Sequence, residues 1–285
     1  MVSPTSRRDA ARYICERWRV SERRACDLAN LRRSTYRYKA RPPKPENLLL
    51  IERMKELAVE HPAWGYKKIA HLLRESGWQV NNKRVRRLWR EAGLKVRRRK
   101  RRRKRAHGSS VSSIMQLAAE RPHHVWTYDF ITDRTRDGRA IKMLVVVDEF
   151  TRRCLTITAR RDFKAEHVVH ELQRLMAIHG VPAHLRSDNG PEFIAQEVRL
   201  WLHGKTRAEY IEPGSPWQNA YIETFNDKLR AEFLNREIFH SLREAQVLLE
   251  QWRILYNEVR PHASLGYDTP DAYAKRQERL PAGAA

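Results

Sequence analysis

The sequence has few cysteines and no long hydrophobic run. Its three cysteines, Cys15, Cys26 and Cys154, form no Cys-x-x-Cys pair and no paired spacing, so we expect buried free thiols in a reducing compartment. No apolar stretch is long enough to span a bilayer, and the sequence shows no secretory signal peptide. These absences argue against a disulfide-rich secreted protein and a membrane protein. We expect a soluble cytosolic chain without a membrane partner.

Acidic residues are scarce in the first third of the chain. Residues 1–105 hold 33 Lys and Arg against 10 Asp and Glu, whereas residues 106–285 hold 24 of each. The whole net charge of +23 therefore lies in the front section. A basic section joined to a charge-balanced globular section is typical of a polyanion-binding arm on a separately folded unit. Such an arm binds phosphate without specifying a base sequence.

Residues 1–41 are predicted to be a basic helical region. Apolar residues recur at helical spacing over residues 7–20, and Ser21 is placed to cap a short helix over residues 22–29. Residues 34–36 can begin a third helix, which completes the outline of a helix-turn-helix. A small basic helical bundle without a role in DNA binding fits the same spacing equally well.

Residues 46–94 follow a stiff proline-rich linker and are predicted to be a second helix-turn-helix domain. Helices are expected over residues 48–59, 66–75 and 82–91, with Asn81 capping the third and Gly93 ending it. The third helix has an apolar face with Val85, Leu88 and Trp89, and an opposite face with Lys83, Arg84, Arg86, Arg87 and Arg90. A helix apolar on one side and basic on the other fits a DNA groove. A solvated charged face is the alternative, and five cations beside one acid, Glu91, make it the weaker one.

Residues 95–120 are predicted to be a basic linker. Ten of the eleven positions from 95 to 105 are Lys or Arg, and such a block repels itself until it meets an anion. We expect it to contact the phosphate backbone of DNA, with Arg97, Arg98 and Arg99 among the contacts. Nuclear targeting is the weaker interpretation, because the neighbouring helices are basic too.

Residues 121–240 are predicted to be an α/β domain, and residues 241–285 a C-terminal helix and tail. Strands are expected over residues 125–131, 141–148 and 154–158, followed by a helix over 164–179. Two further alternations of strand and helix follow, through the segments around Asp188 and Ile211, and another amphipathic helix spans residues 242–256. Three meander strands followed by alternating helices and strands is the order of the ribonuclease H-like fold. We therefore expect a mixed five-stranded sheet flanked by helices.

Three acids stand in settings that suggest metal ligands. Asp129 lies inside a strand pattern, where Asp is disfavoured, and Asp188 lies where a short strand meets the turn sequence Asn-Gly-Pro. Glu223 lies on a predicted helix that presents Asn226, Asp227 and Arg230 on the same face. Taken singly, these acids could be a strand-end acid, a turn former and a surface residue. Together they can converge on one point, as a divalent-metal site requires.

The histidines do not point to a zinc site. His123 and His124 precede the first strand, and His262 lies in the tail, without an accompanying Cys-x-x-Cys. They are better explained by packing or by contact with DNA. Three carboxylates without a cysteine or histidine cluster suit Mg²⁺ better than zinc.

The motifs around the acids carry a resemblance to a known family. They are Trp-Thr-Tyr-Asp-Phe ending at Phe130, Ser-Asp-Asn-Gly-Pro-Glu-Phe from Ser187, Pro-Gly-Ser-Pro-Trp-Gln-Asn-Ala-Tyr-Ile-Glu ending at Glu223, and Tyr-Asn-Glu-Val-Arg-Pro-His-Ala-Ser-Leu-Gly-Tyr from Tyr256. Together they resemble bacterial insertion-sequence transposases of the second-reading-frame (OrfB) type, in the retroviral-integrase-like DDE superfamily. Residues 65–94 resemble the helix-turn-helix that precedes the core in these proteins, so the resemblance covers nearly the whole chain.

One departure from the family concerns spacing. There are 34 residues between Asp188 and Glu223, one fewer than is usual in the family. A deletion in the loop around Gly204 would account for it without consequence, because the motif before Glu223 is intact.

The resemblance implies an active site and its cofactor. It makes Asp129, Asp188 and Glu223 the catalytic and metal-binding triad, with two Mg²⁺ ions per site for which Mn²⁺ can substitute. Asp129 would contact both ions, and Asp188 and Glu223 one each. Water would free a 3′-hydroxyl at the end of the element, and that hydroxyl would attack a second phosphodiester. Further residues expected to touch DNA or shape the site are Arg230, Lys228, Asn189, Gln218 and Asn219.

The resemblance also implies partners. They are double-stranded DNA, as the terminal inverted repeats and the target, and further copies of the chain in a paired-end complex. The upstream reading-frame product is a third partner to test, because residues 1–105 contain no heptad repeat that would replace its leucine zipper. The expected location is the bacterial cytoplasm, in association with the nucleoid. Two alternatives remain: a catalytically silent DNA-binding accessory protein, and a structure-selective nuclease of the same fold.

Overall fold

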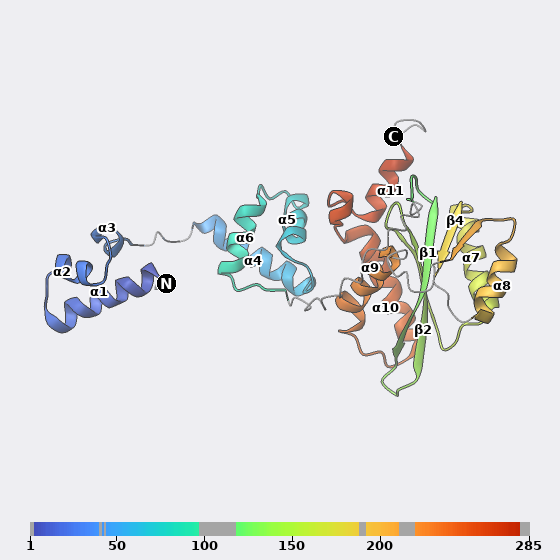
Figure 1. Cartoon of the computed structure of the whole chain (residues 1–285), viewed down its shortest axis with the longest axis horizontal. Helices are drawn as coiled ribbons and strands as arrows, with labels where there is room; N and C mark the ends of the chain where they lie inside the picture. The colour runs from blue at the N-terminus through green and yellow to red at the C-terminus, as the bar shows by residue number, and fades with distance from the viewer. Residues whose placement is uncertain are drawn as a thin grey trace, which may run out of the picture. The chain divides into compact units, whose positions relative to one another are not determined.

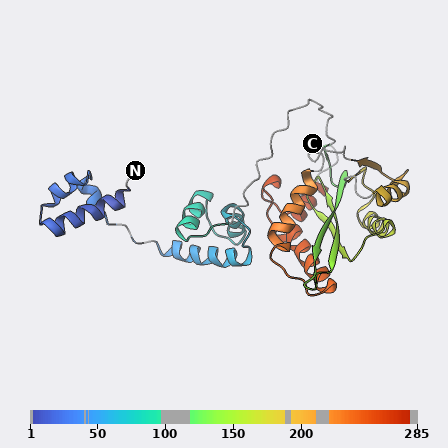
Figure 2. The same cartoon turned by 60° about the horizontal axis from the view of Figure 1, so that its bottom comes forward.

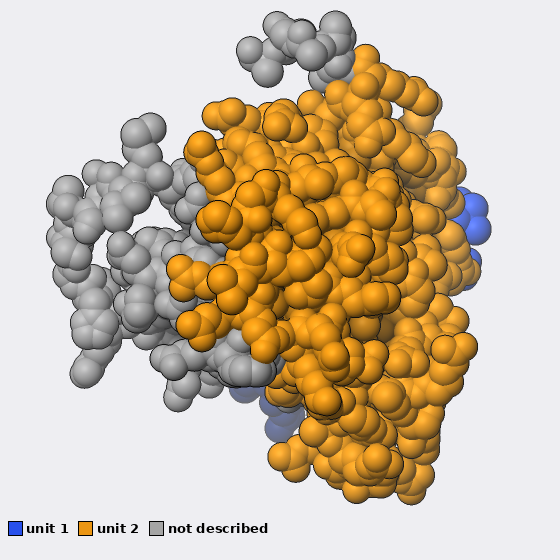
Figure 3. Space-filling model, turned by 90° about the vertical axis from the view of Figure 1, so that its right-hand side faces the viewer, with its two compact units in different colours: residues 1–52 blue, residues 53–285 orange. Residues whose placement is uncertain are grey.

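The chain divides into two compact units, residues 1–52 and 53–285 (Figure 3). The computed structural model describes residues 3–39, 42, 44–96, 118–187, 192–210 and 220–279. For residues 192–195 and 208–210 it describes the backbone alone. The boundary between the units falls within helix α4 (Pro45–Glu60).

The first unit is built from short helices, which confirms the expected helical structure. They are α1 (Pro4–Trp18), α2 (Glu22–Leu28) and α3 (Arg33–Tyr36), drawn in dark blue in Figure 1. Side-chain oxygens begin the first two helices: the Ser3 hydroxyl accepts from the amide of Ser6, and the Ser21 hydroxyl from that of Arg24. The third helix is one turn long, so a helix-turn-helix function for residues 1–41 stays a prediction.

Helices α5 (Tyr66–Glu75) and α6 (Asn82–Glu91) have the bounds that the sequence predicts. The Asn81 side chain accepts a hydrogen bond from the Arg84 amide at 2.7 Å and so begins α6. Gly93, with φ of 69°, takes the left-handed conformation that ends it. The buried faces of the two packed helices are formed by Ile69, Ala70, Leu73, Val85, Leu88 and Trp89.

The second unit contains a mixed five-stranded sheet in the order β3-β2-β1-β4-β5 (Figures 1 and 2). Its strands are β1 (Val125–Arg134), β2 (Ala140–Asp148), β3 (Cys154–Arg160), β4 (His184–Ser187) and β5 (Arg207–Tyr210). The first three strands pair antiparallel, β4 pairs parallel with β1, and β5 pairs parallel with β4. The expected ribonuclease H-like architecture is confirmed.

Helices cover both faces of the sheet (Figure 1). On one face lie α7 (Ala165–His179) and α8 (Glu192–Leu202). On the other lie α9 (Ala220–Leu229), the π-helix η2 (Arg230–Leu234) and α10 (Leu242–Ile254). Along β2, Leu144 and Val146 face the first group, whereas Met143, Val145 and Val147 face the second. This alternation explains why β2 reads as a continuous apolar run.

The C-terminal region differs from its prediction in one respect. The expected helix over residues 242–256 is divided, because α10 ends at Ile254 and the chain continues as the π-helix η3 (Leu255–Val259). A short 3₁₀ turn, η4 (Ala263–Leu265), and α11 (Pro270–Glu278) follow. A π-turn changes the number of residues per turn only locally, so the 3.6-residue apolar pattern does not reveal it.

The three cysteines are unpaired; Cys26 and Cys154 are buried and Cys15 is half-buried. Among the described helices, none has the length and apolar character needed to cross a membrane.

Candidate functional site

Asp129 lies in the interior of β1, where its carboxylate is half-buried. One oxygen, Oδ1, accepts a hydrogen bond from the amide of Phe130 at 2.7 Å. The other, Oδ2, accepts from the side-chain amide of Asn226 at 2.6 Å. A carboxylate in a strand interior needs such partners, and one of them comes from a helix that follows 97 residues later. The contact joins the first expected metal ligand to helix α9.

Glu223 lies on α9, three residues before Asn226, and its side chain is exposed. Residues three apart on a helix are neighbours on one face, so Glu223 belongs to the face that reaches Asp129. Ile222, Phe225 and Leu229 are buried on the adjoining face and hold α9 against the sheet. Apolar packing thereby keeps the helix, and the carboxylate that it carries, beside β1.

Arg230 lies at the other end of this helical face, at the start of η2. Its Nη2 donates to the carbonyl oxygen of Thr132 on β1 at 3.3 Å. Asn226 and Arg230 therefore contact the same strand three residues apart, at Asp129 and Thr132. The half-buried guanidinium lies at the edge of the candidate active site.

Strand β4 leads toward the second expected ligand. Its last residue, Ser187, is buried and pairs with Tyr128, the residue before Asp129. The preceding Arg186 forms a buried ion pair with Glu149, with Nη1 at 2.7 Å and 2.9 Å from the two carboxylate oxygens.

Several predicted site residues lie outside the described residues: Asp188, Asn189, Gln218, Asn219, Arg97, Arg98 and Arg99.

The donor atoms in the described part of the site fit a hard divalent cation. Asp129 and Glu223 offer carboxylate oxygens, and Asn226 offers a buried Oδ1 that has no hydrogen-bond partner among the described atoms. Oxygen ligands of this kind are those that Mg²⁺ prefers. The described residues alone contain no group of three His, Cys, Asp or Glu side chains placed to hold a metal, since the third acid lies outside them. Asn226 was not among the predicted ligands, although its spacing from Glu223 indicated the shared face.

Lys228 occupies a different position from that of Arg230. It lies more than a third of a turn around α9 from Glu223 and is half-buried. Burial, together with the positive charges of Arg260 and Arg152, lowers its pKa to about 8, although the negative charge of Glu232 acts in the opposite direction. A contact between Lys228 and DNA stays a prediction.

The lowered pKa of Lys228 predicts a pH dependence of stability. Between pH 8 and its ordinary pKa of 10.5, Lys228 is mainly deprotonated in the folded chain and protonated in the unfolded chain. The unfolded state then binds more protons, so this residue makes the free energy of unfolding rise with pH across that window. Lys228→Met is expected to remove up to about 1.4 kcal/mol per pH unit of that slope. Denaturant titrations at pH 8 and pH 10 would measure the free energy of unfolding of the unmodified chain and of Lys228→Met. An equal change between the two pH values in both chains would contradict the lowered pKa of Lys228.

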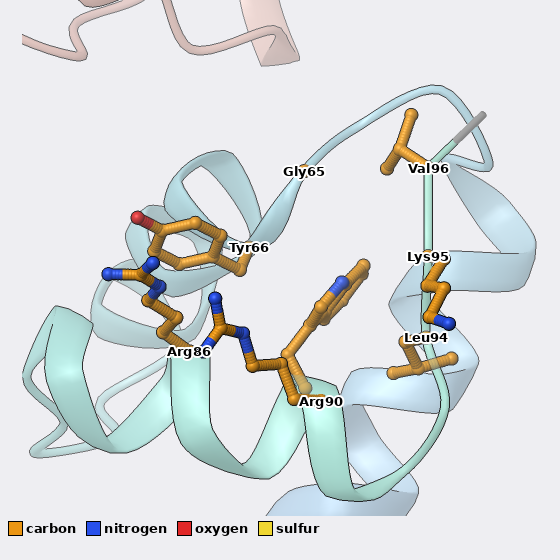
Figure 4. Close-up of a pocket in the computed structure, with 8 residues that line it drawn as sticks. Gly65, Tyr66, Arg86, Arg90, Leu94, Lys95 and Val96 are labelled. Atoms are coloured by element: carbon orange, nitrogen blue, oxygen red, sulfur yellow. The ribbon is translucent and has the colours of Figure 1, made fainter. Parts of the chain in front are cut away.

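Helix α6 presents a basic surface. Lys83, Arg86, Arg87 and Arg90 are exposed and Arg84 is half-buried, as the sequence predicts for the side away from α5. A pocket of about 540 Å³ adjoins this surface and is lined by Gly65, Tyr66, Arg86, Trp89, Arg90, Leu94, Lys95 and Val96. Figure 4 shows Arg86 and Arg90 extending from the same side of α6 toward Tyr66. Three cations and two aromatic rings around one hollow suit an anionic group attached to a larger molecule.

Comparison with known protein families assigns two kinds of domain. Models of an integrase core domain match residues 119–216 and 205–270. A model of an HTH-like domain matches residues 45–102, which include α5 and α6. The matches fall on the two parts of the chain in which the active site and the basic helix were predicted.

Similar curated proteins come from bacterial insertion elements. The chain is 39% identical to an uncharacterized 31.7 kDa protein of insertion element IS407 from Burkholderia multivorans, over 92% of this chain and 94% of that protein. It is 41% identical to an uncharacterized 39.2 kDa protein of IS476 from Xanthomonas euvesicatoria, over 96% of this chain and 78% of that protein. A transposase for insertion sequence element IS904 from Lactococcus lactis is 28% identical over 82% of this chain and 98% of that protein.

Proposed function

Because the chain belongs to the integrase-core family of insertion-element transposases, we propose that it cleaves DNA at the ends of an insertion sequence and joins those ends to target DNA. The enzyme class, a DDE transposase, follows from that membership. The observation that carries the proposal is the hydrogen bond between Asp129 and Asn226, which holds the helix of Glu223 beside the strand of Asp129. This contact supports a shared site for the two carboxylates.

Divalent metal ions would be held by Asp129, Asp188 and Glu223, with Asp129 contacting two ions and the other acids one each. Mg²⁺ suits the oxygen donors, and Mn²⁺ is expected to substitute. When bound, such ions activate the attacking oxygen and stabilise the charge that builds up on the reacting phosphate. The unpartnered Oδ1 of Asn226, beside Asp129, supports the presence of a cation there.

The reaction would proceed by two phosphoryl transfers. Water attacks a phosphodiester at the end of the element; a new P–O bond forms, the bond to the 3′ oxygen breaks, and a 3′-hydroxyl is released. That hydroxyl then attacks a phosphodiester of the target and displaces its 3′ oxygen. The attacking oxygen loses its proton and the leaving oxygen gains one, so no protein nucleophile and no oxidant is needed.

The protein's own groups would orient the substrate. Asn226 fixes the Asp129 carboxylate by its hydrogen bond. Arg230, held at the edge of the site by its hydrogen bond to Thr132, would contact a phosphate near the reacting one. Asn189, Gln218 and Asn219 would shape the site or touch the substrate strand.

DNA would be held mainly by the basic helix. The exposed cations of α6 fit the major groove of a terminal inverted repeat, and the pocket between Arg86, Arg90 and Lys95 fits a backbone phosphate. Arg97, Arg98 and Arg99 would add phosphate contacts. Since an element has two ends, we expect two or more copies of the chain on paired ends, with the upstream reading-frame product as a further partner and a location at the nucleoid.

The test is strand joining by the purified chain on labelled DNA that carries the element's end. We expect joined product in Mg²⁺ or Mn²⁺ and none in EDTA. Binding without cleavage would favour an accessory DNA-binding protein instead. Cleavage without joining of a pre-cut end would favour a nuclease.

A further inference from the structure

The Glu232 side chain connects η2 to two other segments of the chain, the C-terminal region and the helix-turn-helix region. It lies in η2, nine residues after Glu223. Arg260 of the C-terminal region donates to both of its carboxylate oxygens, through Nε at 2.7 Å and through Nη2. From the helix-turn-helix region, Trp64 Nε1 donates to Oε2 at 3.2 Å and Lys68 Nζ lies 3.4 Å from Oε1. One carboxylate thus joins the helix of Glu223 to the tail and to the domain that carries α6.

A second contact supports the same interface. On α5, His71 is one turn beyond Lys68 and stacks on Tyr267 of the tail, with ring centroids 6.1 Å apart and an interplanar angle of 26°. Lys68 and His71 share a face of α5, and Trp64 immediately precedes that helix. The opposite face of α5 packs on α6. Helix α5 therefore lies between the basic helix and the catalytic domain.

The interface is buried, and the Glu232 carboxylate within it is ionised. Trp64 is 3% exposed, and the side chains of Glu232 and Arg260 are 11% and 5% exposed. Burial opposes ionisation of Glu232, but the hydrogen bonds and charge of Arg260, with the charge of Lys68, outweigh it and lower the pKa of Glu232 to about 2. The carboxylate is therefore ionised at neutral pH, when it can accept from all of these donors at once.

Two features allow this contact to set the position of the helix-turn-helix domain relative to the helix of Glu223. The π-helix η2 continues from α9 without a break, so the backbone that holds Glu232 also holds Glu223. Tyr256 of the tail packs edge-to-face on Phe225 of α9, with ring centroids 4.8 Å apart, and keeps Arg260 beside the helix. None of the exposed cations of α6 takes part, so the DNA-binding surface stays available while the contact is made.

We propose that Glu232 is a positioning residue that fixes the helix-turn-helix domain to the helix of Glu223, so that DNA bound by α6 is presented to the active site at a set offset. The proposal rests on the proposed function, since it concerns where the same site cuts. It predicts that the place of cleavage depends on Trp64 and Lys68, which donate to Glu232 and are not among the residues proposed to bind DNA or metal.

The test compares full-length chains that differ only at this interface. The double variant Trp64→Phe/Lys68→Met removes both donors from the helix-turn-helix side and leaves the Arg260–Glu232 pair intact. Lys67→Met is the matched control, because Lys67 is an exposed neighbour on α5 with the same charge. Cleavage of end-labelled element DNA would be mapped at single-nucleotide resolution beside a DNA-affinity measurement at the same salt concentration.

We expect the double variant to bind DNA within about twofold of the unmodified chain, because the basic face of α6 is unchanged. Cleavage at the end of the element should fall by about tenfold or more, with cuts spread over neighbouring phosphodiesters. Lys67→Met should cut at the original position. Cleavage by the double variant at the original rate and position would overturn the proposal, whereas a loss of affinity alone would assign Lys68 to DNA contact.

A second measurement separates this proposal from the proposed function. Hydrogen exchange of the α5 amides needs no catalysis, and we expect about tenfold faster exchange in the double variant and in Glu232→Gln than in Lys67→Met. If the unmodified chain neither cuts nor joins DNA but shows this difference, the interface stands and the proposed function fails. Equal exchange in all the chains would overturn the interface itself.

Discussion

Asp129→Asn is expected to abolish both cleavage and joining, lowering each rate by about a thousandfold or more. The substitution removes the negative charge that the proposed site offers to metal ions. It keeps the shape of the side chain, but the carboxamide has one acceptor oxygen where the carboxylate has two, so only one of the hydrogen bonds from Asn226 and Phe130 is kept. The loss of one hydrogen bond costs about 1 kcal/mol, so the fold should be retained. Rates on labelled end DNA at saturating Mg²⁺, with circular dichroism of the purified variant, would measure the effect.

Asp133→Asn is the matched control on the same strand. Asp133 is half-buried, and its Oδ1 accepts from the amide of Arg134 at 2.8 Å, four residues beyond Asp129. We expect rates within about twofold of the unmodified chain, because a surface substitution away from the site changes little. Equal losses in the two variants would indicate a general effect of charge on DNA binding. Full activity of Asp129→Asn would remove Asp129 from the active site.

Arg260→Ala is expected to lower the free energy of unfolding of the catalytic domain by about 3 kcal/mol or more. Arg260 is 4% exposed and provides the two shortest contacts to Glu232. Its removal leaves an ionised carboxylate largely buried, with only the more distant donors Trp64 and Lys68. Chemical denaturation followed by tryptophan fluorescence would report the change, because Trp252 lies in the adjacent apolar cluster.

Arg53→Ala provides the comparison for an exposed ion pair. Arg53 and Glu56 lie three residues apart on α4, and their side chains are 38% and 59% exposed. Such a pair contributes at most about 1 kcal/mol, so the denaturation midpoint should move little. If Arg260→Ala were no more destabilising than Arg53→Ala, Glu232 could not be the buried, fully ionised group that the structure indicates.

The elements that the sequence predicts well are those with local signals. Helix α6 follows from Asn81 as a cap, the apolar spacing of Val85, Leu88 and Trp89, and Gly93 as its end. The positions of the first three strands along the chain follow in the same way, from short apolar runs separated by turn residues. All of this information lies within a few residues of each element.

The parts that the sequence did not predict depend on contacts between distant residues. Trp64 and Glu232 are separated by 168 residues, and neither has a local feature that names the other. The role of Asn226 toward Asp129 likewise requires the packing of α9 on β1, although the helical spacing gave the correct face. The roles of Asp188, Gln218 and Asn219 in the site stay predictions.

Joining of a pre-cut element end to target DNA tests the central proposal most directly. The reaction would contain the purified full-length chain, labelled end DNA with a free 3′-hydroxyl, and either Mg²⁺ or EDTA. Glu223→Gln would be run in parallel, since it removes one proposed metal ligand from an exposed helical position. We predict joined product that requires the metal and disappears in the variant. Joining in EDTA, or undiminished joining by Glu223→Gln, would contradict the proposed active site.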